Sequence, residues 1–347
     1  MIKAFYYSKK WALWAYGGGF LLILSLWLQV QMTVALNAWY KDFYDLIQSA
    51  ADYKDNSQEG ISLFFSKIVS LDYISGMQFE GTPSFLVIAA PYIVLAVFTS
   101  WFTAIYGLRW REAMTFSYIP KWKNVKKEIE GASQRIQEDC YRFARIVESL
   151  GLQIVRATMT LIAFLPILWN LSVGIVVPFI GDMEGSLVYV SLIVSLGGII
   201  ISWIVGIKLP GLEYNNQKVE AAFRKDLVLG EDDKIKYAKP ERLFELFTGI
   251  RMNYHRLFLH TSYFNFWLNL YDQFMSIALL LVMGPGLFTG VITFGVLIQA
   301  NNAFDRVHNS FNIILYNWTT ITELRSIWKR LYEFERNLDM YLKVERA

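Results

Sequence analysis

The stretch SFLVIAAPYIVLAVFTSWFTAIYGL, Ser84–Leu108, contains no Asp, Glu, Lys or Arg. A helix of roughly 20 apolar residues crosses a hydrocarbon core of about 30 Å, so this stretch is long enough to span a membrane. Three other runs without these four residue types are as long, namely Trp11–Leu36, Ala157–Ile180 and Gly185–Ile207. The four runs predict an integral membrane protein made of α-helices.

The composition supports the same conclusion. The chain has 347 residues, of which 54% are hydrophobic, 16% aromatic and only 18% charged. A soluble domain carries about 25% charged residues. A soluble enzyme is therefore excluded as the class of protein.

Two further segments, 258–283 and 288–318, are less purely apolar and bring the expected spans to six. The remaining parts are an outer loop, 37–83, two long inner segments, 109–156 and 208–256, and a C-terminal amphipathic helix within 319–347. We therefore expect one transmembrane domain over residues 1–347. Its six spans are expected at approximately 11–36, 84–108, 157–180, 185–207, 258–283 and 288–318.

The positive charges predict the orientation. If the N-terminus is cytoplasmic, the inner segments hold 29 of the 33 Lys and Arg residues. Cytoplasmic loops of membrane proteins carry such an excess. Both termini are therefore expected on the cytoplasmic side, in multi-pass topology. The first apolar run is about 26 residues long, against 7–15 for a signal peptide, which favours a retained helix.

The inner segments contain few Pro and Gly residues, and 109–156 shows helical periodicity. We expect the membrane helices to continue into the cytoplasm as long rods. In the outer loop, residues 51–60 are expected to be irregular, and the apolar residues 61–74 to lie on the membrane surface. Six spans with helical extensions after the second and fourth match the membrane half of an ATP-binding-cassette exporter at the level of fold.

Signals for enzymatic chemistry are weak. The sequence has three His residues, no HExxH and one Cys, Cys140, so we expect no metal site, no cofactor and no disulfide. It also has no Gly-Lys pair, which a phosphate-binding P-loop requires. We therefore expect a non-enzymatic chain that binds neither ATP nor nucleic acid.

Acidic residues in the inner segments are the first candidate site. Helical projection places Glu213, Glu220 and Glu231 within roughly 20° of one another. Glu130 and Glu148 share a face about 27 Å apart along the axis, with Glu138 about 80° away. Two readings stay open. Such residues form ordinary surface ion pairs, or neighbouring carboxylates in a shielded cleft repel one another and exchange protons near neutral pH.

A second polar cluster lies within the fifth and sixth expected spans. Asp272, Asp305 and Arg306 stand at similar distances from the outer turn near Leu287. Because an unpaired charge in a membrane is costly, we expect Arg306 to pair with one of the two aspartates or to face a wet cavity. A structural clamp between helices and a cavity lining are both compatible with this pattern.

Three long stretches carry a resemblance to a known family. They are NAWYKDFYDLIQSA at 37–50, IEGASQRIQEDCYRFARIVESLG at 129–151 with MTLIAFLP at 159–166, and VGIKLPGLEYNNQKVEAAFRKDLVLGEDD at 205–233. Weaker matches follow at YFNFW, 263–267, and YNWTTITE, 316–323. With these residues the chain resembles the SbmA/BacA family of bacterial inner-membrane peptide-antibiotic transporters.

The resemblance implies a homodimer with an exporter-like membrane fold that imports peptides by means of the proton gradient. Substrates in such a family include proline-rich peptides and glycopeptide antibiotics. The family's acidic ladder maps onto Glu138, Glu148, Glu220 and Glu231, and nearby acids are Glu130, Glu213, Asp232 and Asp233. Longer relatives carry additional hydrophobic segments before the position of Trp11, and the outer loop here is longer.

These features together predict a proton-coupled peptide importer of the bacterial inner membrane that works by alternating access. Two alternatives stay open at this point. One is a transporter subunit that uses a separate ATPase chain, and the other is a membrane scaffold or lipid-modifying factor that transports nothing.

Overall fold

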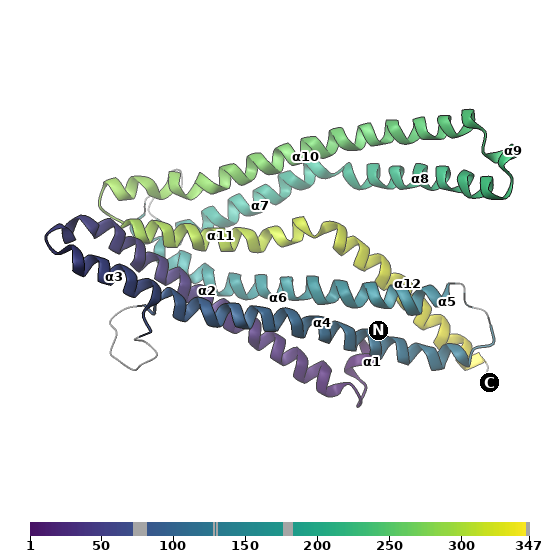
Figure 1. Ribbon diagram of the computed structural model, residues 1–347, viewed down its shortest axis with the longest axis horizontal. Coiled ribbons are helices and arrows are strands. Elements are labelled where there is room, and N and C mark those ends of the chain that lie inside the picture. The colour runs from purple at the N-terminus through teal and green to yellow at the C-terminus, as the bar shows by residue number, and fades with distance from the viewer. Residues whose placement is uncertain (72–81, 128, 130, 176–182, 345–347) are drawn as a thin grey trace. The chain divides into compact units, whose positions relative to one another are not determined.

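The computed structural model describes residues 1–71, 82–127, 129, 131–175 and 183–344, and within these ranges every regular element is helical (Figure 1). The α-helices are α1 (Ile2–Tyr6), α2 (Gly19–Gln48), α3 (Ser57–Val69), α4 (Phe85–Lys123), α5 (Ala132–Gln134), α6 (Cys140–Leu171), α7 (Ser186–Gly206), α8 (Leu209–Asp232), α9 (Lys234–Tyr237), α10 (Pro240–Phe288), α11 (Phe294–Tyr316) and α12 (Trp318–Val344). Two π-helical segments, η1 (Leu13–Gly18) and η3 (Arg135–Asp139), and a 3-10 segment, η2 (Ser49–Asn56), adjoin them.

Five helical runs in the described part of the chain are long and apolar enough to cross a membrane. They are Leu13–Val69, Phe85–Lys123, Ala132–Leu171, Ser186–Asp232 and Pro240–Phe288. Helix α11 lies where the sixth span is expected, but its polar run from Asn301 to Asn312 keeps it outside this group. The all-helical membrane class is confirmed, whereas the count of six is not.

Several helices are longer than a membrane is thick. Helix α4 has 39 residues and α10 has 49, which at 1.5 Å per residue gives about 58 Å and about 74 Å. A hydrocarbon core is about 30 Å thick. Helices of this length necessarily continue beyond a membrane that they cross, as the sequence predicts for the inner segments.

The first inner segment is interrupted. Helix α4 ends at Lys123, and α5 begins at Ala132, after Gly131. Gly131 has φ 68°, a left-handed conformation that ends a right-handed helix and that glycine adopts without steric cost. The described parts of 109–156 therefore belong to separate helical elements, namely the end of α4 and, after Gly131, α5, η3 and the start of α6.

The outer segment is more regular than the sequence suggests. Residues 51–60, which we expected to be irregular, belong to the 3-10 segment η2 and the first turn of α3. Trp39 of α2 donates a hydrogen bond from Nε1 to the carbonyl of Lys67, 2.8 Å away, and so ties α3 back to α2. The expected apolar surface helix is α3, and its predicted residues 72–74 lie outside the described ranges.

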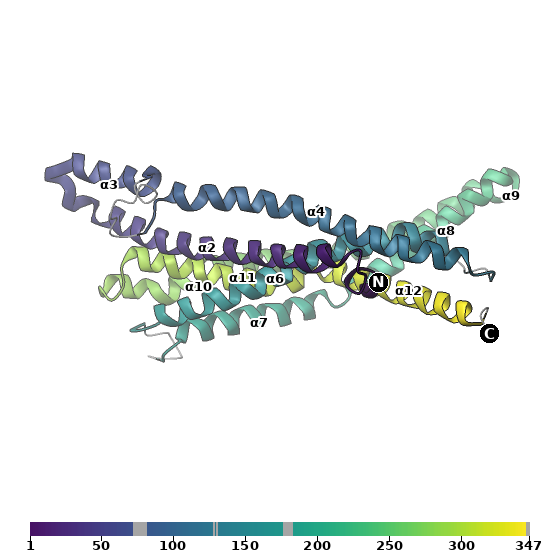
Figure 2. The ribbon, with the colours of Figure 1, turned by 90° about the horizontal axis from the view of Figure 1, so that it is seen from below.

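The chain divides into two compact units, residues 1–191 with 282–347, and residues 192–281. In the first unit α6 packs against α2, α4 and α11, which run alongside it in both views (Figures 1 and 2). In the second unit Asp226 of α8 pairs with Arg242 of α10, and Ser202 of α7 accepts a hydrogen bond from Trp267 of α10.

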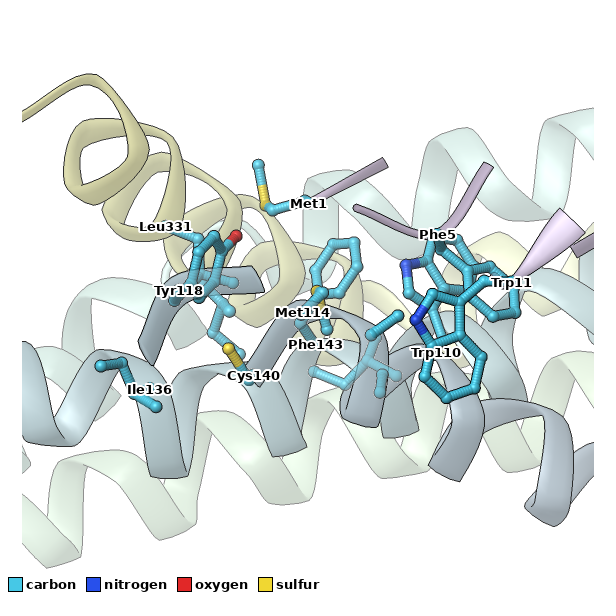
Figure 3. Close-up of a cluster of buried hydrophobic side chains, with 14 of the residues drawn as sticks. Met1, Phe5, Trp11, Trp110, Met114, Tyr118, Ile136, Cys140, Phe143 and Leu331 are labelled. Atoms are coloured by element: carbon cyan, nitrogen blue, oxygen red, sulfur yellow. The ribbon is translucent and has the colours of Figure 1, made fainter. Parts of the chain in front are cut away.

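The main core of the first unit joins α1, α4, η3, α6 and α12 through large apolar side chains (Figure 3). Phe5 stacks on Trp110 with ring centroids 5.4 Å apart, and Trp110 meets the edge of Phe143. Tyr118 packs edge-on against Phe334 of α12. Because most of this core lies beyond the charge-free runs, it fixes the ends of α4, α6 and α12 to one another.

Candidate functional site

Glu148 is the candidate acid that lies at the contact between α4 and α6. It is half-buried on α6, against Gly107 of α4, where an added Cβ atom would lie only 2.4 Å from its Oε2. Among the described residues no basic group comes within 4.0 Å of its carboxylate, since Arg145 donates instead to the hydroxyl of Tyr141. Glu148 precedes the charge-free run that begins at Ala157, and burial raises the pKa of its carboxyl despite the opposing charge of Arg145.

Glu138 is in a different environment, in the π-helical segment η3. Its carboxylate lies 2.8 Å from Arg142, four residues on, and also accepts a hydrogen bond from Gln134. Arg142 in turn pairs with Glu323 of α12 at 3.1 Å. In this conformation Glu138 takes part in a surface ion-pair network, which is the ordinary reading of such spacing.

The other predicted acids belong to the second unit or lie outside the described residues. Glu130 lies outside them. Glu220 is half-buried on α8, and the remaining four acids, Glu213, Glu231, Asp232 and Asp233, are exposed. The side chain of Asp233 accepts a hydrogen bond from the backbone N–H of Lys236 and so caps α9. Whether the acids of the two units form facing rows stays a prediction.

The buried acid that sequence reasoning missed is Asp139. Its side chain is 1% exposed and accepts two hydrogen bonds from Arg330 of α12, from Nε at 3.0 Å and from NH2 at 2.7 Å. Arg135 adds a third at 2.9 Å. Burial alone would raise the pKa of Asp139, but the two guanidinium groups more than offset it and hold the pKa below its usual range.

The spacing of Arg135 and Asp139 was visible in the sequence as a helical i,i+4 pair. The contribution of Arg330, 191 residues away, was not. Asp226, paired with Arg242, was missed for the same reason. Both aspartates are buried, and each pairs with an arginine of another helix.

The intramembrane candidates fall in both units. Asp272 is exposed and belongs to the second unit, whereas Asp305 and Arg306 belong to the first. Asp305 is half-buried and its Oδ2 accepts a hydrogen bond from Asn301 at 3.4 Å. Arg306 is exposed, and among the described contacts it forms no ion pair with Asp305 within 4.0 Å. A partnership of Arg306 with Asp272 stays a prediction.

A polar cluster between three helices also escaped the sequence reading. Gln29 of α2 is 2% exposed, donates to Thr99 of α4 at 2.7 Å and accepts from Arg156 of α6 at 2.8 Å. Ser25 hydrogen-bonds to the same threonine. Isolated Ser, Thr and Gln residues within apolar runs gave no signal of this cluster, because only the packing of three helices brings them together.

Comparison with known proteins shows the family to which this chain belongs. The model of the SbmA/BacA-like family matches residues 8–339. The inner membrane ABC transporter ATP-binding protein YddA of Escherichia coli K12 is 25% identical over 339 residues, which cover 91% of this chain and 56% of that protein. The chloroplastic ABC transporter D family member 2 of Arabidopsis thaliana is 27% identical over 323 residues, covering 89% and 41%. The chain spans about half the length of the curated relatives it matches. Since the family model covers nearly all of it, the chain belongs to the SbmA/BacA-like family.

Proposed function

We propose that this chain forms a homodimer that imports peptides across the bacterial inner membrane, driven by the proton gradient, with proline-rich and glycopeptide antibiotics among its substrates. Family membership and five membrane-capable helices support a transporter. The excess of Lys and Arg in the inner segments supports cytoplasmic termini. The observation that carries the proton-coupled mechanism is Glu148.

A coupling carboxylate must be able to bind and release a proton within the working pH range. Asp139 is not such a group, because the two arginines that pair with it hold the pKa of its carboxyl below its usual range. Glu148 is half-buried, has no ion-pair partner among the described residues and lies on the junction of α4 and α6. Protonation there removes a desolvated charge from the contact between two long helices, which shifts the balance between two arrangements of that contact.

The second subunit is supported by apolar surface on the second inner segment. Phe244, Phe247 and Met252 of α10 are 69%, 52% and 57% exposed, in a segment expected outside the membrane. Exposed apolar patches of this kind mark interaction surfaces. We propose that a second copy covers them. A cysteine introduced at Phe244 should then form crosslinked dimers in native membranes, while a cysteine introduced at the exposed Lys234 of α9 serves as the control.

The mechanism is tested by uptake of a labelled proline-rich peptide into proteoliposomes with an imposed pH gradient. Glu148→Gln should lower gradient-driven uptake at least about tenfold, equivalent to about 1.4 kcal/mol, and flatten its pH profile. The matched control is Glu112→Gln, because Glu112 is a partly exposed acid of α4 that pairs with Arg109 at 2.9 Å. Uptake by Glu148→Gln with an unchanged pH profile would refute the role of Glu148.

The second candidate function is the membrane part of an ABC-type transporter whose ATPase is separate from residues 1–347. It is favoured by the names of the relatives, which are ATP-binding proteins of ABC transporters of nearly twice the matched length. The same proteoliposomes distinguish the two. Uptake that needs ATP and an added ATPase, and that is indifferent to a protonophore, would establish the second candidate in place of the first.

A further inference from the structure

Helix α11 begins where two side chains from the end of α2 meet it, and both helices belong to the first unit. Asp45 Oδ1 accepts a hydrogen bond from the backbone N–H of Gly295 at 2.9 Å. Gln48 Oε1 accepts one from the backbone N–H of Phe294 at 2.8 Å. The first N–H groups of an α-helix have no partner within that helix. The neighbouring helix α2 therefore supplies two caps of α11.

The first turn of α11 also has a cap of its own. Thr293 Oγ1 accepts a hydrogen bond from the backbone N–H of Val296 at 3.3 Å, and this bond does not involve α2. If α2 moves away, water at the outer surface can bind the N–H groups of Phe294 and Gly295, because the first N–H groups of a helix make no bond within it. The contact between the two helices can thus open without unwinding α11.

Gly295 lets the two backbones touch. A Cβ atom added at this residue would lie 2.1 Å from the carbonyl oxygen of Lys41, which is one turn before Asp45 on α2. Only a residue without a side chain permits this approach. Beside it, the ring of Tyr44 packs edge-on against Phe294, with ring centroids 5.6 Å apart. We call this contact the outer joint; it is made by Lys41, Tyr44, Asp45 and Gln48 of α2 and by Phe294 and Gly295 of α11.

Asn37 lies one turn deeper than Lys41 on the same face of α2. It precedes Lys41 by four residues and Asp45 by eight, a spacing that places all three on one side of a helix. Its side chain is 3% exposed, and neither its Nδ2 nor its Oδ1 has a hydrogen-bond partner among the described residues. A buried amide without partners is costly, and water would satisfy it once the joint opened. The closed joint therefore gains two capping bonds and loses the hydration of one amide.

The inner half of α2 is held by contacts of another kind. Leu22 belongs to the main apolar core of the first unit. Gln29, which is 2% exposed, hydrogen-bonds to Thr99 of α4 and to Arg156 of α6. At the outer end, α3 follows α2 along the chain through η2 and is tied to it by Trp39, so that α2 and α3 move together. The outer joint is accordingly the place where the ends of α2 and α11 can part.

We propose that Asp45 and Gln48 are gating residues, which close the outer end of the first unit when they cap α11 and release it when peptide enters from outside. This inference rests on the proposed import, because an importer that works by alternating access must open and close its outer end. In the closed state the two side chains cap α11 and Asn37 is shielded from water. In the open state water binds the freed N–H groups and Asn37, and Thr293 still caps Val296. Because the bonds lost and gained are of the same kind, the two states can lie close in free energy, as a substrate-driven shift between them requires.

The first test measures how often the outer joint opens. Asn37→Cys places a buried thiol beneath the joint, and the rate at which a membrane-impermeant maleimide labels it from outside reports the opening. The native thiol, Cys140, is buried. Adding Asp45→Ala should raise the labelling rate about tenfold, equivalent to about 1.4 kcal/mol. Adding Asp45→Asn should leave it unchanged, since Asn caps a helix as well as Asp does. The matched control is Asp42→Ala, because Asp42 of α2 pairs with Lys67 of α3 at 3.6 Å and so lies outside the joint.

The second test locks the outer joint during transport. Tyr44→Cys with Phe294→Cys is crosslinked by a short bifunctional thiosulfonate, and uptake of a labelled proline-rich peptide into proteoliposomes is measured before and after reduction. The crosslinked protein should take up peptide at least about tenfold more slowly and recover on reduction. Phe43→Cys with Phe64→Cys is the control pair, because these rings lie 5.4 Å apart and join α2 to α3 instead. Crosslinking the control pair should leave uptake unchanged.

Unchanged labelling in Asp45→Ala, or an equal acceleration in Asp42→Ala, would overturn the gating role. Normal uptake by the protein crosslinked between positions 44 and 294, or an equal loss of uptake in the control pair, would overturn it as well. Wild-type protein that takes up no peptide would refute the proposed import. The labelling rates, which need no peptide, would then still decide whether Asp45 closes the outer end.

Discussion

Replacing Arg330 by Met should loosen the joint between η3 and α12 without removing the packing of the arginine stem. Asp139 would keep Arg135 as its one charged partner and would lose the two hydrogen bonds from Arg330, at 3.0 and 2.7 Å. Breaking a buried ion pair costs roughly 3–5 kcal/mol. Because the Arg330 side chain is 36% exposed and Arg135 remains, we expect about 2–3 kcal/mol, below that range.

The neighbouring residue provides a local assay. Cys140 is the only cysteine in the sequence, directly follows Asp139, and is 0% exposed. A maleimide reacts with it only when this region opens, so its labelling rate reports the free energy of local opening. At about 1.4 kcal/mol per factor of ten, 2–3 kcal/mol predicts labelling about 30- to 150-fold faster.

Arg325→Met is the matched control for this experiment, since Arg325 is an exposed arginine of the same helix and has no ion pair among the described residues. Its labelling rate should equal that of the wild type. A change of less than about threefold in Arg330→Met, or an equal acceleration in both variants, would show that the buried pair does not hold this joint.

Three further predictions follow from contacts in both units. A Cβ atom added at Gly198 would lie 2.0 Å from the aromatic side chain of Tyr271, whereas one added at Gly197 would meet open space. Gly198→Ala should therefore lower the free energy of unfolding by roughly 1–3 kcal/mol. Gly197→Ala should raise it by up to about 1 kcal/mol. Gly107→Ala should displace the Glu148 carboxylate and reduce gradient-driven uptake, although an alanine by itself favours helix. The pKa of Asp139 is held below its usual range. The charged carboxylate therefore stabilises the folded protein above about pH 4, and this stabilisation is lost as the pH falls below that value. Between pH 6 and pH 3, Asp139→Asn should lose less thermal stability than the wild type.

The sequence predicted those features that depend on local pattern. Long charge-free runs correctly indicated membrane-capable helices. The amphipathic C-terminal helix predicted within 319–347 is α12, Trp318–Val344. Each of these depends on residues that are neighbours along one helix, and for this reason composition and periodicity suffice.

Helical projection failed at one identifiable place. It assumed a continuous α-helix through 109–156. Gly131, however, has a left-handed backbone conformation, and Arg135–Asp139 is a π-helical turn. A π-helical turn holds more residues than an α-helical turn, so every angle projected across it is displaced. The 80° separation assigned to Glu138 therefore assumed an α-helical geometry that Arg135–Asp139 does not have.

Glu138 and Asp139 have different environments because successive residues of a helix point in directions roughly 100° apart. Asp139 lies in the core, where it pairs with Arg330, and Glu138 lies at the surface beside Arg142. Nine residues further on, Glu148 returns to the buried side of α6 but meets the bare backbone of Gly107 instead of an arginine. A carboxylate in contact with glycine can lose its charge without leaving a cation unpaired, whereas Asp139 cannot. The residue type is similar at all three positions, and the contacts of each carboxylate decide whether an arginine compensates its charge.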